Sequence, residues 1–334
     1  MSGPITGGFT MTRKLAAIAI AWLALCGHAA AQEVVFASLE DARRILSAPD
    51  AYSKAMSAFD RSVRLRTERD VSEGEFLAFA ARAAQDWERE ERAAIEAQLK
   101  PVLASVKRLA LPLPQRIYLV KTSGAEDADA AYTRQNAIML PASKLALRDG
   151  ALRHLIAHEL FHVSTRAYPA LADSLYEAIG FQRCEVELPA ALKARRITNP
   201  DAPQDRHCIR VGVGSEETWT LPVLLSTASK EEIARGGTFL DHVTVALLLV
   251  EKTPGNAAAE PRTEDRRLRI VGVEEVSGFF EQIGRNTSYI IHPEEIVADN
   301  FAVLAAGGRE VRSPEILARI AKIIASFGAT VPAP

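Results

Sequence analysis

The spacing of apolar residues divides the chain into a helical first part and a mixed second part. Between about residues 36 and 109, apolar side chains recur every three or four positions, which is the period of a helix with one buried face. One run has steps of 4, 3, 4 and 3 between its apolar members, which are Ile95, Leu99, Val102, Val106 and Leu109. Pro101 lies inside this run, so we expect the helix to kink or restart there. Ser72 and Glu75 have the spacing of a capping box, which predicts another helix start.

After residue 110 the pattern changes between strand-like and helix-like segments. Residues 116–121 alternate and are rich in β-formers, and residues 137–140 form a second short apolar segment. Both segments predict strands. Three longer strand-like segments follow at residues 207–213, 218–225 and 243–250. Residues 253–267 are polar and contain two prolines and a glycine, which predicts an exposed loop.

Five segments of the second part have helical spacing. Asp149 and Gly150 open the strongest of them, and Pro169 opens the next, which ends at Gly180. Three more helices are predicted near the C-terminus, at residues 274–283, 293–306 and 314–327. The sequence therefore predicts an α+β fold that is mostly helical and contains a small mixed sheet.

The composition is that of a globular protein. Of 334 residues, 48% are hydrophobic and 25% are charged, and the formal net charge is −2, which suits a chain that can bury a sizeable core. No cluster of Lys and Arg is interleaved with aromatic residues, so no nucleic-acid partner is expected. We expect an N-terminal helical region at residues 32–110, a larger domain at residues 111–328 and a disordered tail at residues 329–334.

The N-terminus, residues 1–31, has the pattern of a cleaved signal peptide. Arg13 and Lys14 provide the positive region, residues 15–26 are apolar, and three alanines at residues 29–31 provide a small-residue cleavage pattern. The apolar stretch of 12 residues is too short to span a bilayer, which needs about 20. Met11 directly precedes the positive region and is an alternative start. A buried N-terminal helix is the other interpretation.

Export would determine which cysteines remain in the mature chain and whether they form a disulfide. Cys26 leaves with the signal peptide, and the bulky Leu25 before it argues against a lipoprotein cleavage site and a lipid anchor. The mature chain keeps Cys184 and Cys208. In an oxidising compartment, periplasmic or extracellular, these two suggest one disulfide. Two buried free thiols are the alternative, and the lack of a CxxC spacing argues against metal binding by this pair.

An HExxH sequence lies inside the helix that is predicted from residue 149. His158 and His162 are four positions apart, so both imidazoles lie on one helix face and can bind one ion. Imidazole is a good zinc ligand, and two such ligands leave room for a third protein group and a water. Glu159 lies beside the first histidine, where its carboxylate can accept a proton from that water. A surface helix with two unrelated histidines is the alternative.

The third ligand indicates the family. Metzincins have a third histidine six residues after the second, but this position is Tyr168, and Thr165 stands where they have glycine. Residues 295–299 read Glu-Ile-Val-Ala-Asp. Together with HExxH, this segment resembles the gluzincin peptidases, such as thermolysin and neprilysin, in which a later helix carries Glu-x-x-Ala-Asp.

The resemblance implies a zincin-like catalytic core with Zn²⁺ as its cofactor. His158, His162 and Glu295 are then the metal ligands, and Asp299 supports a ligating histidine by accepting its N–H. Glu295 and Asp299 are four positions apart, which places both carboxylates on one helix face.

Two other glutamates remain alternatives for the third ligand. Glu294 is the register-shifted choice, and Glu177 lies 15 residues after His162. Residues 293–295 are also an ordinary helix opening, with a proline and two acids. The 133 residues that separate His162 from Glu295 imply an insertion between the ligand helices. The resemblance therefore covers one strand, two helices and two short motifs.

Candidates for the group that stabilises the tetrahedral intermediate are weaker. Gluzincins often use a tyrosine or histidine across the cleft for this purpose. Tyr289 and His292 lie just before the predicted ligand helix, and His242 lies in the insertion. Each can equally be a packing or capping residue. Residues 136–140 precede the zinc helix, where the resemblance implies an edge strand that binds extended peptide.

The sequence therefore predicts an exported zinc metallopeptidase that acts on a peptide or protein, with Glu159 as the general base. The mature chain is expected to have no membrane span. One alternative is an exported binding or scaffold protein with a structural or degenerate metal site. Another is an amidase that acts on cell-wall peptides.

Overall fold

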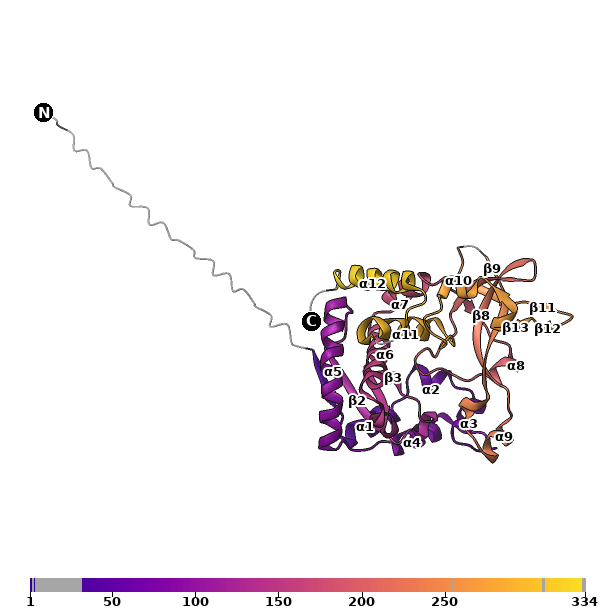
Figure 1. The fold of residues 1–334 in the computed structure, drawn as a ribbon, viewed down its shortest axis with the longest axis horizontal. Helices are drawn as coiled ribbons and strands as arrows, with labels where there is room; N and C mark the ends of the chain where they lie inside the picture. Colours follow the sequence, from indigo (N-terminus) through magenta and orange to yellow (C-terminus); the bar gives the residue numbers. More distant parts are fainter. Residues whose placement is uncertain (2, 4–31, 254, 308–309, 332–334) are drawn as a thin grey trace.

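The computed structural model describes residues 1, 3, 32–253, 255–307 and 310–331. Apart from Met1 and Gly3, the predicted signal peptide lies outside the described residues, as do residues 332–334 of the predicted tail. The fold is α+β, as predicted. A mainly helical half lies beside a half that is built on a β-sheet (Figure 1). No described helix is long and apolar enough to cross a membrane.

A four-stranded sheet has the strand order β1-β2-β4-β3. Its strands are β1 (Glu33–Phe36), β2 (Arg116–Thr122), β3 (Tyr132–Arg134) and β4 (Ala137–Pro141). β1 and β4 run parallel to β2, and β3 runs antiparallel to β4. The two strands predicted at residues 116–121 and 137–140 are therefore confirmed. The expectation that residues 136–140 form the sheet edge is wrong, because β3 pairs with the outer side of β4 and is itself the edge.

Five helices lie in the N-terminal region. They are α1 (Leu39–Ser47), α2 (Ala51–Ala55), α3 (Ala58–Arg64), α4 (Glu73–Arg82) and α5 (Arg89–Leu109). α4 begins at the predicted capping box, in which Ser72 and Glu75 each accept the other's backbone N–H. α5 passes Pro101 as one helix, so the predicted restart does not occur. Its face with Ile95 and Val102 is buried in the main core, and this packing offsets the roughly 3 kcal/mol that an internal proline costs.

Four helices surround the main hydrophobic core. They are α6 (Asp149–Ala167), α7 (Pro169–Glu177), α11 (Pro293–Ala306) and α12 (Pro314–Gly328). α6 packs against both α5 and α11, and the rings of Phe161 on α6 and Phe301 on α11 are 5.5 Å apart between centroids. All four helices lie where the apolar spacing predicts them. The HExxH motif therefore lies within α6, a helix of the main core.

A second sheet has the main strand order β14-β7-β8-β9-β10-β6, and β5 pairs with β7 while β13 pairs with β9. Its strands are β5 (Phe181–Arg183), β6 (Glu185–Val186), β7 (His207–Val213), β8 (Glu216–Ser226), β9 (Val243–Lys252), β10 (Ala258–Pro261), β13 (Ile270–Val271) and β14 (Val276–Ser277). The three long predicted strands are confirmed as β7, β8 and β9. Short helices connect the elements: η1 (Ala125–Asp127), η2 (Ala142–Ala146), α8 (Ala190–Lys193), α9 (Lys230–Arg235) and η3 (Phe239–His242).

Two expectations for this half are wrong. Residues 253–267 do not form an open loop, because β10 pairs with β9 and β6, and β11 (Thr263–Glu264) pairs with β12 (Arg267–Leu268). Residues 274–283 do not form one helix, because η4 (Val273–Glu275) and β14 precede the short α10 (Phe279–Ile283). Pairing with β7 holds β14 extended against its local helical pattern. Gly278, with a φ of +82°, then turns the chain into α10.

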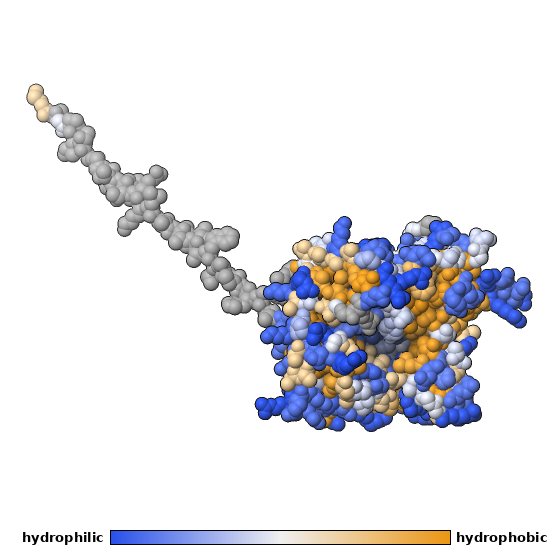
Figure 2. Space-filling view, in the orientation of Figure 1, coloured by the Kyte–Doolittle hydropathy of each residue, from blue (hydrophilic) through white to orange (hydrophobic). Residues whose placement is uncertain are grey.

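The long strands β7, β8 and β9 of the second sheet are buried in their middle parts. Alternate residues of β9 face two different clusters: Leu247 belongs to the main core, whereas Leu248 joins a second cluster with the cysteines. In that cluster Cys184 and Cys208 form the predicted disulfide, with their Cα atoms 5.4 Å apart. Figure 2 shows hydrophobic residues over α12 and β8 on the visible face, with hydrophilic residues around its rim.

Candidate metal centre

α6 presents the two histidines of the HExxH motif on one face. The rings of His158 and His162 are 4.6 Å apart between centroids and almost perpendicular. Both side chains are buried, which is unusual for two polar groups unless each has a partner. The helical period alone produces this pairing, as the sequence predicts.

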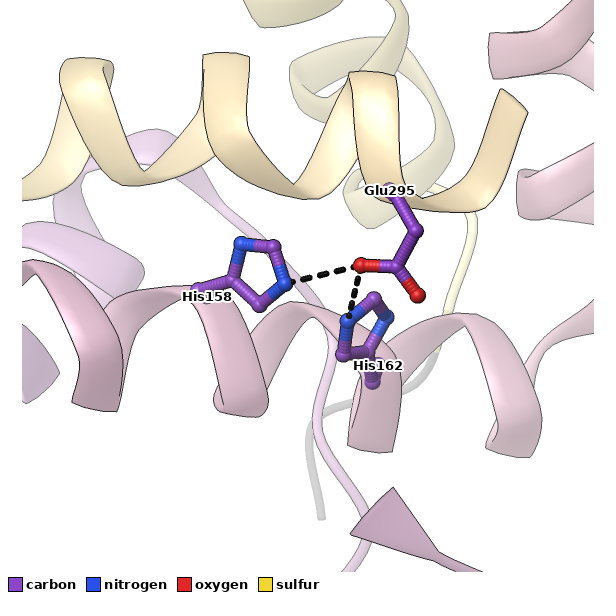
Figure 3. Close-up of side chains that lie close together, drawn as sticks. All are labelled: His158, His162 and Glu295. Carbon is purple, nitrogen blue, oxygen red and sulfur yellow. Dashed lines mark hydrogen bonds and ion pairs between the residues drawn. The ribbon is translucent and has the colours of Figure 1, made fainter. Parts of the chain in front are cut away.

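α11 brings Glu295 against both rings. Its Oε2 lies 3.0 Å from His158 Nε2 and 3.4 Å from His162 Nε2 (Figure 3). The ligand atoms of these three residues all lie within 4.8 Å of one another. Glu295 therefore lies where the resemblance implies the third ligand, against both histidine rings.

The chemistry of this group suits a zinc ion. Two imidazole nitrogens and one carboxylate oxygen are the donor set of several catalytic zinc sites. His162 Nε2 is buried, and its contact with Glu295 Oε2 at 3.4 Å lacks hydrogen-bond geometry. Such an atom carries a desolvation cost that a bound ion would remove. The residues therefore fit the metal that the motif implies.

The other two glutamate candidates do not point at this centre. Glu294 Oε1 lies 2.7 Å from His162 Nδ1, on the side of the ring away from Glu295, and Glu294 also accepts hydrogen bonds from Thr165 and Tyr176. Glu294 therefore has the geometry of a group that orients His162. Glu177 is exposed at the end of α7.

Asp299 has a different partner from the one that the resemblance implies. Its Oδ1 lies 2.7 Å from His154 Nε2 and 3.9 Å from His158 Nδ1. Asp299 therefore lies on the far side of the His158 ring, as expected, but its short hydrogen bond is to His154. His154 lies outside the HExxH motif, although its position one turn before His158 places it on the same helix face.

Glu159 lies beside the two histidines and is held by the first sheet. Its side chain is almost fully buried, and Thr133 Oγ1 on β3 donates a hydrogen bond to Glu159 Oε2 at 3.0 Å. Burial raises the pKa of Glu159, because the charged form is poorly solvated there. A raised pKa suits a group that takes up a proton and later returns it.

The ionisable groups of this centre shift one another's pKa values. Burial disfavours the imidazolium of His158, but the hydrogen bond to Glu295 and the charges of Glu295 and Glu159 together outweigh it and raise the pKa. For His162, burial is likewise outweighed, by Asp201 and Glu295, and its pKa lies well above the usual value. Burial opposes ionisation of Glu295, yet the two histidines hold its pKa well below the usual range. A metal ion would compete with protons for the two imidazoles, because a ligating nitrogen must be deprotonated.

A loop from the insertion completes the site. Between α8 and β7, Asn199 Nδ2 donates to Glu295 Oε1 at 2.7 Å, and Asp201 Oδ1 accepts the backbone N–H of Thr133 at 2.8 Å. Asp201, Glu159 and His162 form a second group whose ligand atoms lie within 4.8 Å of one another. No motif marks Asn199 or Asp201 in the sequence, so sequence analysis misses both.

The three candidates for stabilising the tetrahedral intermediate lie in different places. Tyr289 lines a cavity of about 400 Å³ together with Glu159 and Glu295, and its ring centroid is 6.2 Å from that of His158. His292 caps α11 through its Nδ1, which accepts the Glu294 N–H, and it lines a separate cavity of about 590 Å³. His242 lies in η3 and lines neither cavity. Among the three, only Tyr289 shares the cavity of the metal centre.

Comparison with known proteins gives no match, either to a family model, to a curated protein or to a solved structure.

Proposed function

We propose that the chain is a zinc-dependent peptidase of the gluzincin type, with a zincin-like core formed by the first sheet, α6 and α11. The observation that carries this proposal is the convergence of two imidazoles and one carboxylate oxygen, from helices far apart in sequence, beside a buried Glu159. A structural helix pair has no need for this arrangement, because burying ionisable groups costs stability.

The roles of the residues follow from their positions. A bound zinc ion supplies Lewis-acid polarisation and lowers the pKa of water at the site. Glu159 takes the proton of the attacking water and delivers it to the leaving amine. Thr133 holds one oxygen of Glu159 and leaves the other for this proton transfer. Tyr289 stands at the same cavity and is the better placed candidate for stabilising the tetrahedral intermediate.

The substrate is a peptide or protein that enters the cavity of about 400 Å³. The cavity has an apolar side, to which Leu147 and Leu155 contribute, so an apolar side chain fits next to the scissile bond. The disulfide and the predicted signal peptide favour a periplasmic or secreted enzyme. An amidase that acts on cell-wall peptides would use the same residues, and peptide and cell-wall substrates distinguish the two enzymes.

The experiment uses mature protein from residue 32 onward. We expect one zinc per chain, hydrolysis of unfolded protein or peptide substrates, and loss of activity when a chelator removes the metal. Activity should return when zinc is added back. Protein that contains no zinc and cannot be loaded with it contradicts the proposal.

A closed, non-catalytic metal site is a second candidate, and the position of Asp201 is the observation that favours it. Its carboxylate lies within 4.8 Å of ligand atoms of His162 and Glu159, and in this candidate it joins His162, His158 and Glu295 as a fourth ligand. A fourth protein ligand would leave no position for water, as in structural zinc sites. Asp201→Asn distinguishes the two: zinc affinity stays nearly unchanged in the peptidase and falls sharply in the closed site.

A further inference from the structure

The third ligand has a partner on its second oxygen. Glu295 Oε2 faces the two imidazoles, while Glu295 Oε1 accepts a hydrogen bond of 2.7 Å from Asn199 Nδ2. Both side chains are buried. Asn199 belongs to the loop between α8 and β7, outside both sequence motifs. Asn199, a residue outside the motifs, therefore contributes to the orientation of the Glu295 carboxylate.

The orientation of the Asn199 amide is fixed by a second hydrogen bond. Its Oδ1 accepts the backbone N–H of Asp201 at 3.0 Å, so its NH₂ group faces Glu295. The flipped amide would place two oxygens against each other and leave the Asp201 N–H without this acceptor. Asn199 is thus a donor toward the carboxylate and cannot change that role without losing its hydrogen bond from the Asp201 N–H.

The loop is held at Thr198 by the N-terminal region. Thr198 N donates to Asp60 Oδ2 at 2.9 Å, and Arg64 Nη2 donates to Thr198 O at 2.8 Å. Asp60 and Arg64 are themselves a buried ion pair on α3, with 3.0 Å between Arg64 Nε and Asp60 Oδ1. Both backbone groups of the residue before Asn199 are therefore fixed by charged side chains, which form strong hydrogen bonds.

We infer that Asn199 is a positioning residue for the metal: it holds the Glu295 carboxylate so that Oε2 is directed at His158 and His162 before the ion binds. Asp60 and Arg64 of α3 in turn hold Asn199 through Thr198. A preset carboxylate loses less rotamer freedom on metal binding, so affinity rises. Groups that orient metal ligands in this way contribute about 10- to 100-fold in metal affinity. The inference rests on the proposed metal site.

The test measures the zinc dissociation constant by competition with a chromophoric chelator. Asn199→Asp keeps the shape of the side chain and the acceptor for the Asp201 N–H, but it removes the donor to Glu295. Asn199→Ala removes both hydrogen bonds. We expect zinc affinity to fall by about 10- to 100-fold in each variant. Wild-type affinity in Asn199→Asp would overturn the inference.

Asn286→Ala is the matched control. Asn286 also makes several loop hydrogen bonds, to Asn300, Arg312 and Ser313, but it contacts no proposed ligand. We expect its zinc affinity to equal that of the wild type. An equal loss of affinity in this control would show that any weakened loop has the same effect, and would overturn the inference.

A double-mutant cycle separates positioning from a general structural role. In a Glu295→Ala background the carboxylate is gone and the two histidines alone bind zinc weakly, so the dissociation constant is measured there by direct titration at high zinc concentration. The further change Asn199→Ala should then weaken zinc binding by less than about twofold. The full 10- to 100-fold loss in that background would mean that Asn199 does not act through Glu295. A wild-type protein that binds no zinc overturns the proposed function as well, whereas equal binding by wild type and Asn199→Asp overturns only this inference.

Discussion

The helix pair α6–α11 and the strands β7–β9 are both buried, but they bury different chemistry. The helix pair encloses two histidines, three glutamates and an aspartate, and each of them faces at least one of the others; these are His158, Glu159, His162, Glu294, Glu295 and Asp299. The buried side chains of β8 and β9 are apolar or hydroxylic, and a disulfide lies in the cluster against them.

This difference indicates that the helix pair carries the proposed chemistry and that the strands support the fold. Buried ionisable groups cost stability unless they are paired, and a mutual network of them repays its cost mainly by binding or reacting. Apolar strands and a disulfide have no such cost and hold the fold. Changes in the helix pair should therefore alter chemistry, whereas changes in the sheet should alter stability.

The largest expected effect is the loss of metal and activity in His162→Ala. His162 supplies one imidazole, and its removal leaves two ligands at the centre, which hold zinc poorly. We expect zinc content near zero and no measurable peptide hydrolysis. Metal analysis after gel filtration measures the first, and a fluorogenic peptide assay the second. One zinc retained per chain would show that the ligand set is different.

The next largest expected effect is a loss of turnover without a loss of zinc, in Glu159→Gln. Glu159→Gln keeps the volume of the side chain and its contact with Thr133, but it removes the proton acceptor. We expect zinc binding to stay and turnover to fall by about 10²- to 10⁴-fold. Steady-state kinetics on zinc-loaded protein measure this fall. Thr133→Val provides a comparison, because it leaves the carboxylate in place, and its loss of turnover should be smaller. Equal turnover in Glu159→Gln and wild type would remove Glu159 from the mechanism.

The disulfide tests the other half of the comparison, because a change beside the second sheet should alter stability and not zinc binding. Replacing both Cys184 and Cys208 by serine opens a loop with a sequence separation of 24, which the chain-entropy model relates to about 3 kcal/mol of unfolding free energy. We expect lower stability in urea unfolding and an unchanged zinc dissociation constant near neutral pH. A large loss of zinc affinity in folded protein would show that the sheet and the metal centre are not separable.

The sequence predicts the helix pair well because its geometry is local. Two histidines at i and i+4 share a face wherever the helix forms, and Glu295 and Asp299 follow the same rule on α11. The strands β7, β8 and β9 are also recognisable, since long apolar runs predict buried strands. These predictions require only the period of one element.

The contacts that sequence analysis misses depend on where separate segments meet. Asn199 and Thr133 are ordinary loop and strand residues until the fold places them against Glu295 and Glu159. Asp299 reaches His154 because α11 crosses α6 in a particular register. β14 is extended because it pairs with β7, although its local sequence favours a helix. No periodicity within a segment contains this information.

The smallest predicted effect concerns His292, which joins the two regions by capping α11 while its ring packs near that of His207 on β7. Burial and the neighbouring His207 lower the pKa of His292 to about 3. The pKa of a histidine in the unfolded chain is about 6.5. Between pH 3 and pH 6.5 the unfolded chain therefore binds more protons than the folded one. Stability is therefore lost as pH falls from about 6.5 toward 3, by at most about 1.4 kcal/mol per pH unit.

His292→Asn keeps a capping acceptor and removes this titration. Urea unfolding of the metal-free proteins at pH 6.5 and pH 5 should show a loss that is about 1.6 kcal/mol larger for the wild type than for the variant. Parallel losses would mean that His292 is not held neutral by the fold, and that acid sensitivity arises in the other ionisable groups of the helix pair.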